Sequence, residues 1–168
     1  MSKKINNQKG FTFIELAVVL AIGLIIATIA IPNIARFLAT QDLETETKTI
    51  AAMLRSAQEK SMSQEESSRW GVSFYNNPSG RDEYTLFQVN EGSFASTTVS
   101  VPGTTLDSRL MKKNLTFSYP ASSVRYNVAF SKINGEPSTV NAIVVESVSD
   151  SSSNFSISIN GSGGIDYE

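Results

Sequence analysis

The chain has 168 residues, of which 40% are hydrophobic and 18% are charged, and it contains neither cysteine nor histidine. Without cysteine it has no disulfide framework, thiol nucleophile or thiolate metal ligand, and without histidine it lacks the commonest metal ligand and the usual general base near neutral pH. Fourteen basic and sixteen acidic side chains give a net charge of −2, too balanced to indicate a nucleic-acid partner. The composition therefore argues against an enzyme and against a metal or other cofactor.

The charge is unevenly distributed along the chain. Residues 1–10 form a basic leader of +3 that contains Lys3, Lys4 and Lys9 and no acid. The other eleven basic and sixteen acidic side chains leave −5 on residues 11–168. Basic residues ahead of an apolar segment keep the N-terminus in the cytoplasm by the positive-inside rule. We therefore expect a cytoplasmic leader and a periplasmic body.

An apolar segment follows the leader. Residues 16–35 are twenty residues without a charge, and as a helix they would span roughly 30 Å, the hydrocarbon thickness of a bilayer. We expect residues 11–35 to form a single transmembrane helix in the inner membrane. A buried core helix is a weaker alternative because the segment is apolar on all faces. Three features argue against a cleaved secretory signal: the length of the apolar segment, the acidic residue Glu15 next to it and the lack of a clear signal-peptidase site.

Two residues do not fit a plain membrane helix. An acidic side chain in the membrane costs about 2.5–3.5 kcal/mol, so Glu15 is a candidate functional residue that needs a partner. Pro32 has no N–H and would free the carbonyl four residues earlier, which predicts a kink or a softened helix at this point.

The residues around Glu15 carry a family resemblance. The segment 9–16, KGFTFIEL, and the apolar run behind it resemble the class III signal of type IV pilins and type II secretion pseudopilins. In that family a short basic leader ends in glycine, cleavage falls before a phenylalanine, and a glutamate follows at the fifth mature position. Gly10, Phe11 and Glu15 match this pattern, and Pro32 falls where the family has its helix-softening proline.

The resemblance implies a structural subunit with no catalytic residues of its own. A prepilin peptidase would cleave between Gly10 and Phe11 and would N-methylate Phe11. The new α-amine would be charged at neutral pH. It would give Glu15 a cation, either on the same helix or on a neighbouring subunit during assembly. The implied partners are the peptidase, other pilin or pseudopilin subunits and, before assembly, the inner membrane.

Residues 36–63 are expected to continue the same helix in amphipathic form. Apolar and small side chains recur there with a period of about 3.6 residues, and neither proline nor glycine interrupts them. We predict one helix over residues 11–62 whose second half packs on a domain. The predicted buried stripe consists of Leu43, Thr47, Ile50, Leu54, Ala57 and Ser61.

Residues 64–168 are expected to form a β-rich periplasmic domain. Short runs that alternate apolar and polar residues are separated by turn sequences rich in asparagine, glycine and proline. The predicted fold class is therefore α+β, with one long helix packed on antiparallel β-structure. The predicted strands cover residues 70–75, 84–89, 97–101, 115–119, 124–130, 142–148 and 155–160, with a short closing strand at 165–167. The predicted aromatic core consists of Trp70, Phe74, Phe87, Phe117, Phe130 and Phe155.

Two further features of this domain are interpreted as surface. Arg109, Lys112 and Lys113 form a basic cluster that could contact phosphates, but on an acidic body we expect them in a solvated loop. A nucleic-acid partner is therefore not expected. Residues 147–153 are rich in serine and are expected to form a mobile loop.

The body of the chain also bears a resemblance within the pilin group. Residues 51–61, the Trp70-Gly-Val strand after them and the closing turn at Asn160-Gly161 resemble the H-type minor pseudopilins of type II secretion and their FimT-like pilus relatives. The primary hypothesis is a minor subunit of a type II secretion pseudopilus or a type IV pilus. The alternative is a singly anchored periplasmic domain that binds a ligand or partner without polymerising.

Overall fold

The computed structural model describes residues 10–89 and 103–168, and for residues 29, 30, 32, 33 and 35 it describes the backbone alone. The chain comprises two compact units, Met1–Leu38 and Ala39–Glu168. Lys3, Lys4 and Lys9 of the leader and the strand predicted at residues 97–101 lie outside the described residues.

A single helix, α1 (Phe13–Met62), begins in the N-terminal unit and ends in the globular unit. It starts two residues later than predicted and ends at the predicted residue, and its backbone stays helical through Gly23 and Pro32. A short 3-10 turn (Glu65–Ser67) follows it. In the globular unit, the predicted stripe of α1 is confirmed because all six of its side chains are fully buried: Leu43, Thr47, Ile50, Leu54, Ala57 and Ser61.

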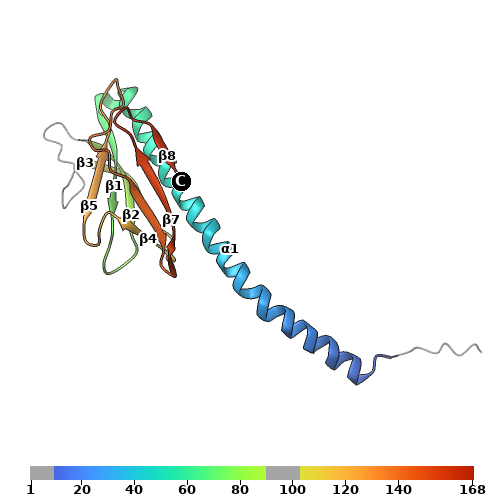
Figure 1. Cartoon of the computed structure of the whole chain (residues 1–168). Helices are drawn as coiled ribbons and strands as arrows, with labels where there is room; N and C mark the ends of the chain where they lie inside the picture. Colours follow the sequence, from blue (N-terminus) through green and yellow to red (C-terminus); the bar gives the residue numbers. More distant parts are fainter. Residues whose placement is uncertain (1–9, 90–102) are drawn as a thin grey trace, which may run out of the picture. The chain divides into compact units, whose positions relative to one another are not determined.

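The globular unit adds two four-stranded antiparallel sheets to the second half of α1 (Figure 1). The first sheet has the order β3-β2-β1-β5 and is made of β1 (Arg69–Tyr75), β2 (Glu83–Val89), β3 (Gly103–Leu110) and β5 (Arg125–Ala129). The second has the order β4-β6-β7-β8 and is made of β4 (Leu115–Tyr119), β6 (Ile143–Ser147), β7 (Asp150–Ile159) and β8 (Ile165–Tyr167). The α+β prediction is confirmed, and the pairings between these strands are all antiparallel.

Two strands differ from the prediction. The sequence does not predict β3, because its residues, GTTLDSRL, are mostly exposed and show no apolar alternation. Arg109 therefore lies in a strand and not in a loop. β7 begins at Asp150, which pairs with Ser147, and the pairing resumes with shifted register between Glu146 and Asn154. The predicted loop at residues 147–153 is therefore too long. Strand pairing uses backbone groups and needs no apolar side chain, so a serine-rich segment can also form a strand.

One hydrophobic core joins α1 to both sheets. Of the six aromatic side chains predicted for it, five are buried, and Phe155 is partly buried against the core. Phe74 of β1 and Phe117 of β4 make an edge-to-face contact with ring centroids 5.7 Å apart, which ties the two sheets together. Ser61 Oγ accepts a hydrogen bond from the backbone N–H of Trp70 at 2.7 Å and so fixes the start of β1 to the end of α1.

Two polar side chains of α1 bind the hairpin formed by β7 and β8. Arg55 Nη2 donates to the carbonyl of Ile165 at 2.8 Å. Gln58 Nε2 donates to the carbonyl of Gly163 at 2.8 Å and to that of Gly135 at 3.0 Å. Gly163 has a φ of +88°, and a Cβ there would lie 2.3 Å from Gln58 Nε2. The contact therefore requires glycine at this turn, both for its backbone angle and for the close approach.

Gly71 is expected to be a glycine that the centre of the first sheet requires. It lies in β1, between β2 and β5, and a Cβ there would stand 2.4 Å from the carbonyl oxygen of Val128 and 2.8 Å from the ring of Phe87. Gly71→Ala should therefore overpack the sheet and lower the free energy of unfolding by about 1–3 kcal/mol. Gly161→Ala is the matched control, since nothing lies within 4 Å of its Cβ position. The single tryptophan, buried Trp70, reports denaturation by fluorescence. Coincident denaturation curves for the two variants would contradict this prediction.

Candidate processing and assembly site

The predicted cleavage point lies directly before the start of α1. Gly10, Phe11 and Thr12 are not helical, and the helix begins at Phe13. The side chain of Phe11 is 90% exposed. Apart from Gly10 and its two chain neighbours, no heavy atom of the described residues lies within 4 Å of the position that a Cβ would take at Gly10. The peptide bond between Gly10 and Phe11 is therefore accessible to another protein, and the fold of the chain itself does not require a glycine at position 10.

Thr12 and Glu15 close the start of α1 with reciprocal hydrogen bonds. The backbone N–H of Glu15 donates to Thr12 Oγ1 at 3.3 Å, and the backbone N–H of Thr12 donates to Glu15 Oε2 at 2.8 Å. The hydroxyl of Thr12 donates to the same carboxylate oxygen at 2.8 Å. This arrangement is a capping box, in which each side chain satisfies a backbone donor of the other residue.

The cap changes the interpretation of Glu15. The sequence suggests an acid that lacks a partner until Phe11 becomes a free amine. In the structure the carboxylate accepts two bonds from Thr12, both on Oε2, which leaves Oε1 for a further donor. It also lies at the helix N-terminus, where the helix dipole favours negative charge. The Thr-x-x-Glu spacing of residues 12–15 is the signal from which this cap could have been predicted.

The N-terminal unit presents apolar side chains to its surroundings. The large hydrophobic residues described between Phe13 and Leu38 are all at least half exposed. A contiguous apolar surface of this kind marks contact with lipid or with another protein. One turn before Pro32, Thr28 Oγ1 donates to the carbonyl of Ile25 at 2.7 Å, and the kink at Pro32 stays a prediction.

No helical segment within the described residues is long and apolar enough to cross a membrane.

Two of the three cations of the basic cluster form ion pairs within the globular unit. Arg109 Nη2 lies 2.9 Å from Asp107 Oδ2 in the same strand, and Lys112 Nζ lies 2.6 Å from Asp42 Oδ1 on α1. The hydrogen bond from the Lys112 ammonium holds the pKa of Asp42 below its usual value. Because these two cations are partnered within the subunit, they are less available to phosphates than the sequence alone suggests. Lys113, the third member of the cluster, is exposed.

Comparisons with known proteins found a match to the N-terminal segment and a match to the fold. Residues 5–31 match the family model of the prokaryotic N-terminal methylation motif, and this range includes Gly10, Phe11 and Glu15. A search of curated proteins found no matching sequence. The fold is similar to the crystal structure of the type IV minor pilin FimU of Pseudomonas aeruginosa, strain PAO1. The two share 21% sequence identity at a TM-score of 0.50, and the similarity covers 75% of this chain and 92% of that one. The chain thus carries the prokaryotic N-terminal methylation motif at its N-terminus, and its fold is similar to that of a solved minor pilin.

Proposed function

We propose that this chain is a structural subunit, of the minor type, of a type IV pilus or a type II secretion pseudopilus. The observation that carries the proposal is the methylation motif over residues 5–31, at a helix start where the peptide before Phe11 is exposed and Glu15 is held at the helix N-terminus. The likeness to a solved minor pilin and the resemblance to H-type and FimT-like subunits support the minor assignment. The role is structural and needs no cofactor.

Processing supplies the charge on which assembly depends. A prepilin peptidase hydrolyses the bond between Gly10 and Phe11, which consumes one water and leaves a carboxylate on Gly10 and an ammonium on Phe11. The leader departs with its three lysines, so the side chains of residues 11–168 retain a charge of −5. The same enzyme then transfers a methyl group from a sulfonium methyl donor to the new amine of Phe11, which loses one proton as the donor leaves as a thioether.

The new ammonium and Glu15 form the pair that we assign to assembly. Glu15 Oε2 is occupied by Thr12, whereas Oε1 can accept a bond from the ammonium of Phe11 in the same chain or in a neighbouring subunit. An acid in apolar surroundings is costly unless it is paired. The register that brings an ammonium to Glu15 is therefore favoured over others, and the exposed apolar side chains of α1 then pack on neighbouring helices.

Before assembly, we place residues 11–35 in the inner membrane, with the leader in the cytoplasm and the globular unit in the periplasm. The support is the uncharged run of residues 16–35 and the basic leader that precedes it. Prepilin peptidase and other pilin or pseudopilin subunits are the partners. A softened helix at Pro32 would let the segment adjust as it leaves the membrane for the fibre.

The test is the mass and N-terminal sequence of the protein isolated from its native membranes and fibres. We expect the first residue to be N-methylated Phe11. A chain that keeps Met1 and Lys9 and carries no N-methyl group would contradict the proposal, and it would favour the singly anchored domain that does not polymerise.

A further inference from the structure

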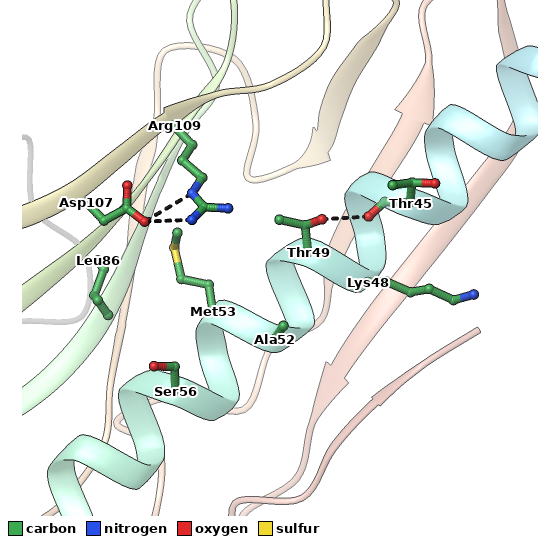
Figure 2. Close-up of a pocket in the computed structure, with 9 residues that line it drawn as sticks. All are labelled: Thr45, Lys48, Thr49, Ala52, Met53, Ser56, Leu86, Asp107 and Arg109. Atoms are coloured by element: carbon green, nitrogen blue, oxygen red, sulfur yellow. Dashed lines mark hydrogen bonds and ion pairs between the residues drawn. The ribbon is translucent and has the colours of Figure 1, made fainter.

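A groove of about 500 Å³ lies in the globular unit between α1 and the first sheet, where Leu86 of β2 and Asp107 and Arg109 of the edge strand β3 face the helix (Figure 2). Both cations of its lining are paired. Lys48 Nζ lies 2.6 Å from Glu44 Oε1, and Arg109 Nη2 lies 2.9 Å from Asp107 Oδ2. The charges of the groove therefore do not select a ligand, and the chemistry that the structure points to lies elsewhere, beside the end of α1.

The turn between β5 and β6 contains one of the two asparagine–glycine sequences of the chain, Asn134-Gly135. The other, Asn160-Gly161, follows β7. Asparagine is one of the chemically labile residues of proteins. A glycine after it leaves the backbone nitrogen open to the side-chain amide, because glycine has no side chain and few forbidden backbone angles. The two sites share this sequence signal, so any difference between them comes from their structures.

At Asn160 the side-chain amide is held in place by three hydrogen bonds. Its Oδ1 accepts from the backbone N–H of Ser162 at 3.1 Å, from the Ser162 hydroxyl at 2.8 Å and from the backbone N–H of Gly164 at 2.7 Å. Attack by the nitrogen of Gly161 requires the amide to rotate until its carbon faces that nitrogen. This rotation gives up hydrogen bonds, which is costly. The structure therefore protects Asn160.

At Asn134 the side-chain amide is not held. The residue is exposed, and no group of the described residues bonds its side chain. The backbone N–H of Gly135 donates to the carbonyl of Ser131 at 3.3 Å, which is longer than a usual N–H···O bond. The amide of Asn134 is thus free to rotate, and the nitrogen that would attack it is only weakly bonded.

The residue before Asn134 strains this turn. Ile133 has a φ of +74°, which β-branched residues avoid. The backbone N–H of Asn134 donates to the carbonyl of Lys132 at 2.9 Å and closes a three-residue turn around Ile133. The side chain of Ile133 is 72% exposed, so packing offsets little of the strain. Such a turn opens more readily than a relaxed one, and opening lets the nitrogen of Gly135 approach the amide of Asn134.

Gly135 joins the turn to two other parts of the globular unit. Its carbonyl accepts a hydrogen bond from Gln58 Nε2 of α1 at 3.0 Å, and the same nitrogen bonds the carbonyl of Gly163 after β7. A Cβ at Gly135 would lie 2.9 Å from Met62 Sδ, at the last residue of α1. A change in the backbone next to Gly135 therefore affects the end of α1 and the turn between β7 and β8.

We propose that Asn134 is a site of spontaneous deamidation, and that its product loosens the turn of residues 131–136 from the end of α1. The nitrogen of Gly135 loses its proton to hydroxide and forms a bond to Asn134 Cγ. The bond from Cγ to Nδ2 then breaks, and the leaving nitrogen takes a proton from water and departs as ammonia. This leaves a cyclic succinimide.

Water opens the succinimide at either carbonyl and gives aspartate or isoaspartate. Both products add a negative charge at position 134. Isoaspartate also adds one methylene to the backbone ahead of Gly135, which moves its carbonyl away from Gln58 Nε2. The reaction consumes only water, so it does not depend on cleavage before Phe11 or on assembly.

The test is incubation of the full chain, purified in detergent, in mildly alkaline buffer, followed by proteolysis and mass spectrometry of the peptides. The peptide that contains Asn134 should acquire the mass of the acid at least about tenfold faster than the peptide that contains Asn160, whose amide must give up its hydrogen bonds. The rate should rise with pH, because the nitrogen of Gly135 must lose its proton. In denaturant the two rates should become similar. Equal rates in the folded chain, or a ratio that persists in denaturant, would overturn the proposal.

Two variants test the loosening of the turn. Asn134→Gln keeps an exposed amide but requires a larger ring for the same attack, so its denaturation curve, followed through buried Trp70, should not change on incubation. The curve of the parent chain should shift to lower denaturant concentration as isoaspartate accumulates. Fresh Asn134→Asp carries the charge on a normal backbone and should denature like the fresh parent chain. If the parent chain converts to isoaspartate and its curve does not shift relative to Asn134→Gln, the loosening is refuted.

Discussion

Gly10→Val is expected to slow processing strongly, so that the protein accumulates as a precursor that keeps residues 1–10. The structure leaves open space around the Cβ position of Gly10, so the branched side chain should not disturb the chain itself. A loss of cleavage would then mean that the valine side chain does not fit the active site of the peptidase. That site must bring protein atoms close to the scissile bond. Because each added carbon can cost a tight site tenfold or more, we expect cleavage to slow by about 100-fold or more.

The measurement is the ratio of precursor to processed chain over time after a pulse of synthesis, read by mass. Gly23→Ala is the control, since its Cβ position is equally open and it lies outside the cleavage region. It should be processed at the parent rate. Full-speed cleavage of Gly10→Val would remove the peptidase assignment.

Glu15→Ala should still be inserted and cleaved, but its incorporation into fibres should fall at least about tenfold, because the ammonium of Phe11 loses its carboxylate in apolar surroundings. The predicted cleavage bond lies outside α1 and does not involve the Glu15 side chain, so processing should continue. Incorporation is measured as the fraction of processed subunit recovered in sheared fibres.

Two further variants separate the charge of Glu15 from its role in the helix cap. Glu15→Gln keeps an oxygen that can accept from the N–H of Thr12 but carries no charge, so we expect it to assemble as poorly as Glu15→Ala. Thr12→Val removes the hydroxyl and leaves the carboxylate charged, so we expect a smaller loss. Normal assembly of Glu15→Gln would show that the cap matters and the ion pair does not.

The parts of the fold that sequence predicts well are those in which burial follows a regular period. The stripe from Leu43 to Ser61 repeats every three or four residues, so its burial follows from helix geometry. Strands with buried faces, such as β1 and β4, can be predicted equally well because large aromatic residues point into the core.

The parts that sequence misses depend on backbone bonds or on contacts between distant segments. β3 is an exposed edge strand, so no apolar alternation reveals it, and the groove beside it requires residues of α1 to meet Leu86, Asp107 and Arg109. The ion pair between Lys112 and Asp42 joins residues 70 positions apart, which no local pattern encodes. The cap formed by Thr12 and Glu15 is a different case, since a local signal for it exists in the sequence.

The bonds from α1 to the hairpin of β7 and β8 make the globular unit late to complete during synthesis. Arg55 and Ile165 are 110 positions apart, and Gln58 and Gly163 are 105 apart. Contacts at such separation cannot form until both segments have been synthesised, and they are slow to close. The cap formed by Thr12 and Glu15, in contrast, joins residues three positions apart and is made long before them. The segment that we propose for cleavage is therefore complete while the hairpin is still absent, so cleavage and folding of the globular unit can proceed as separate events.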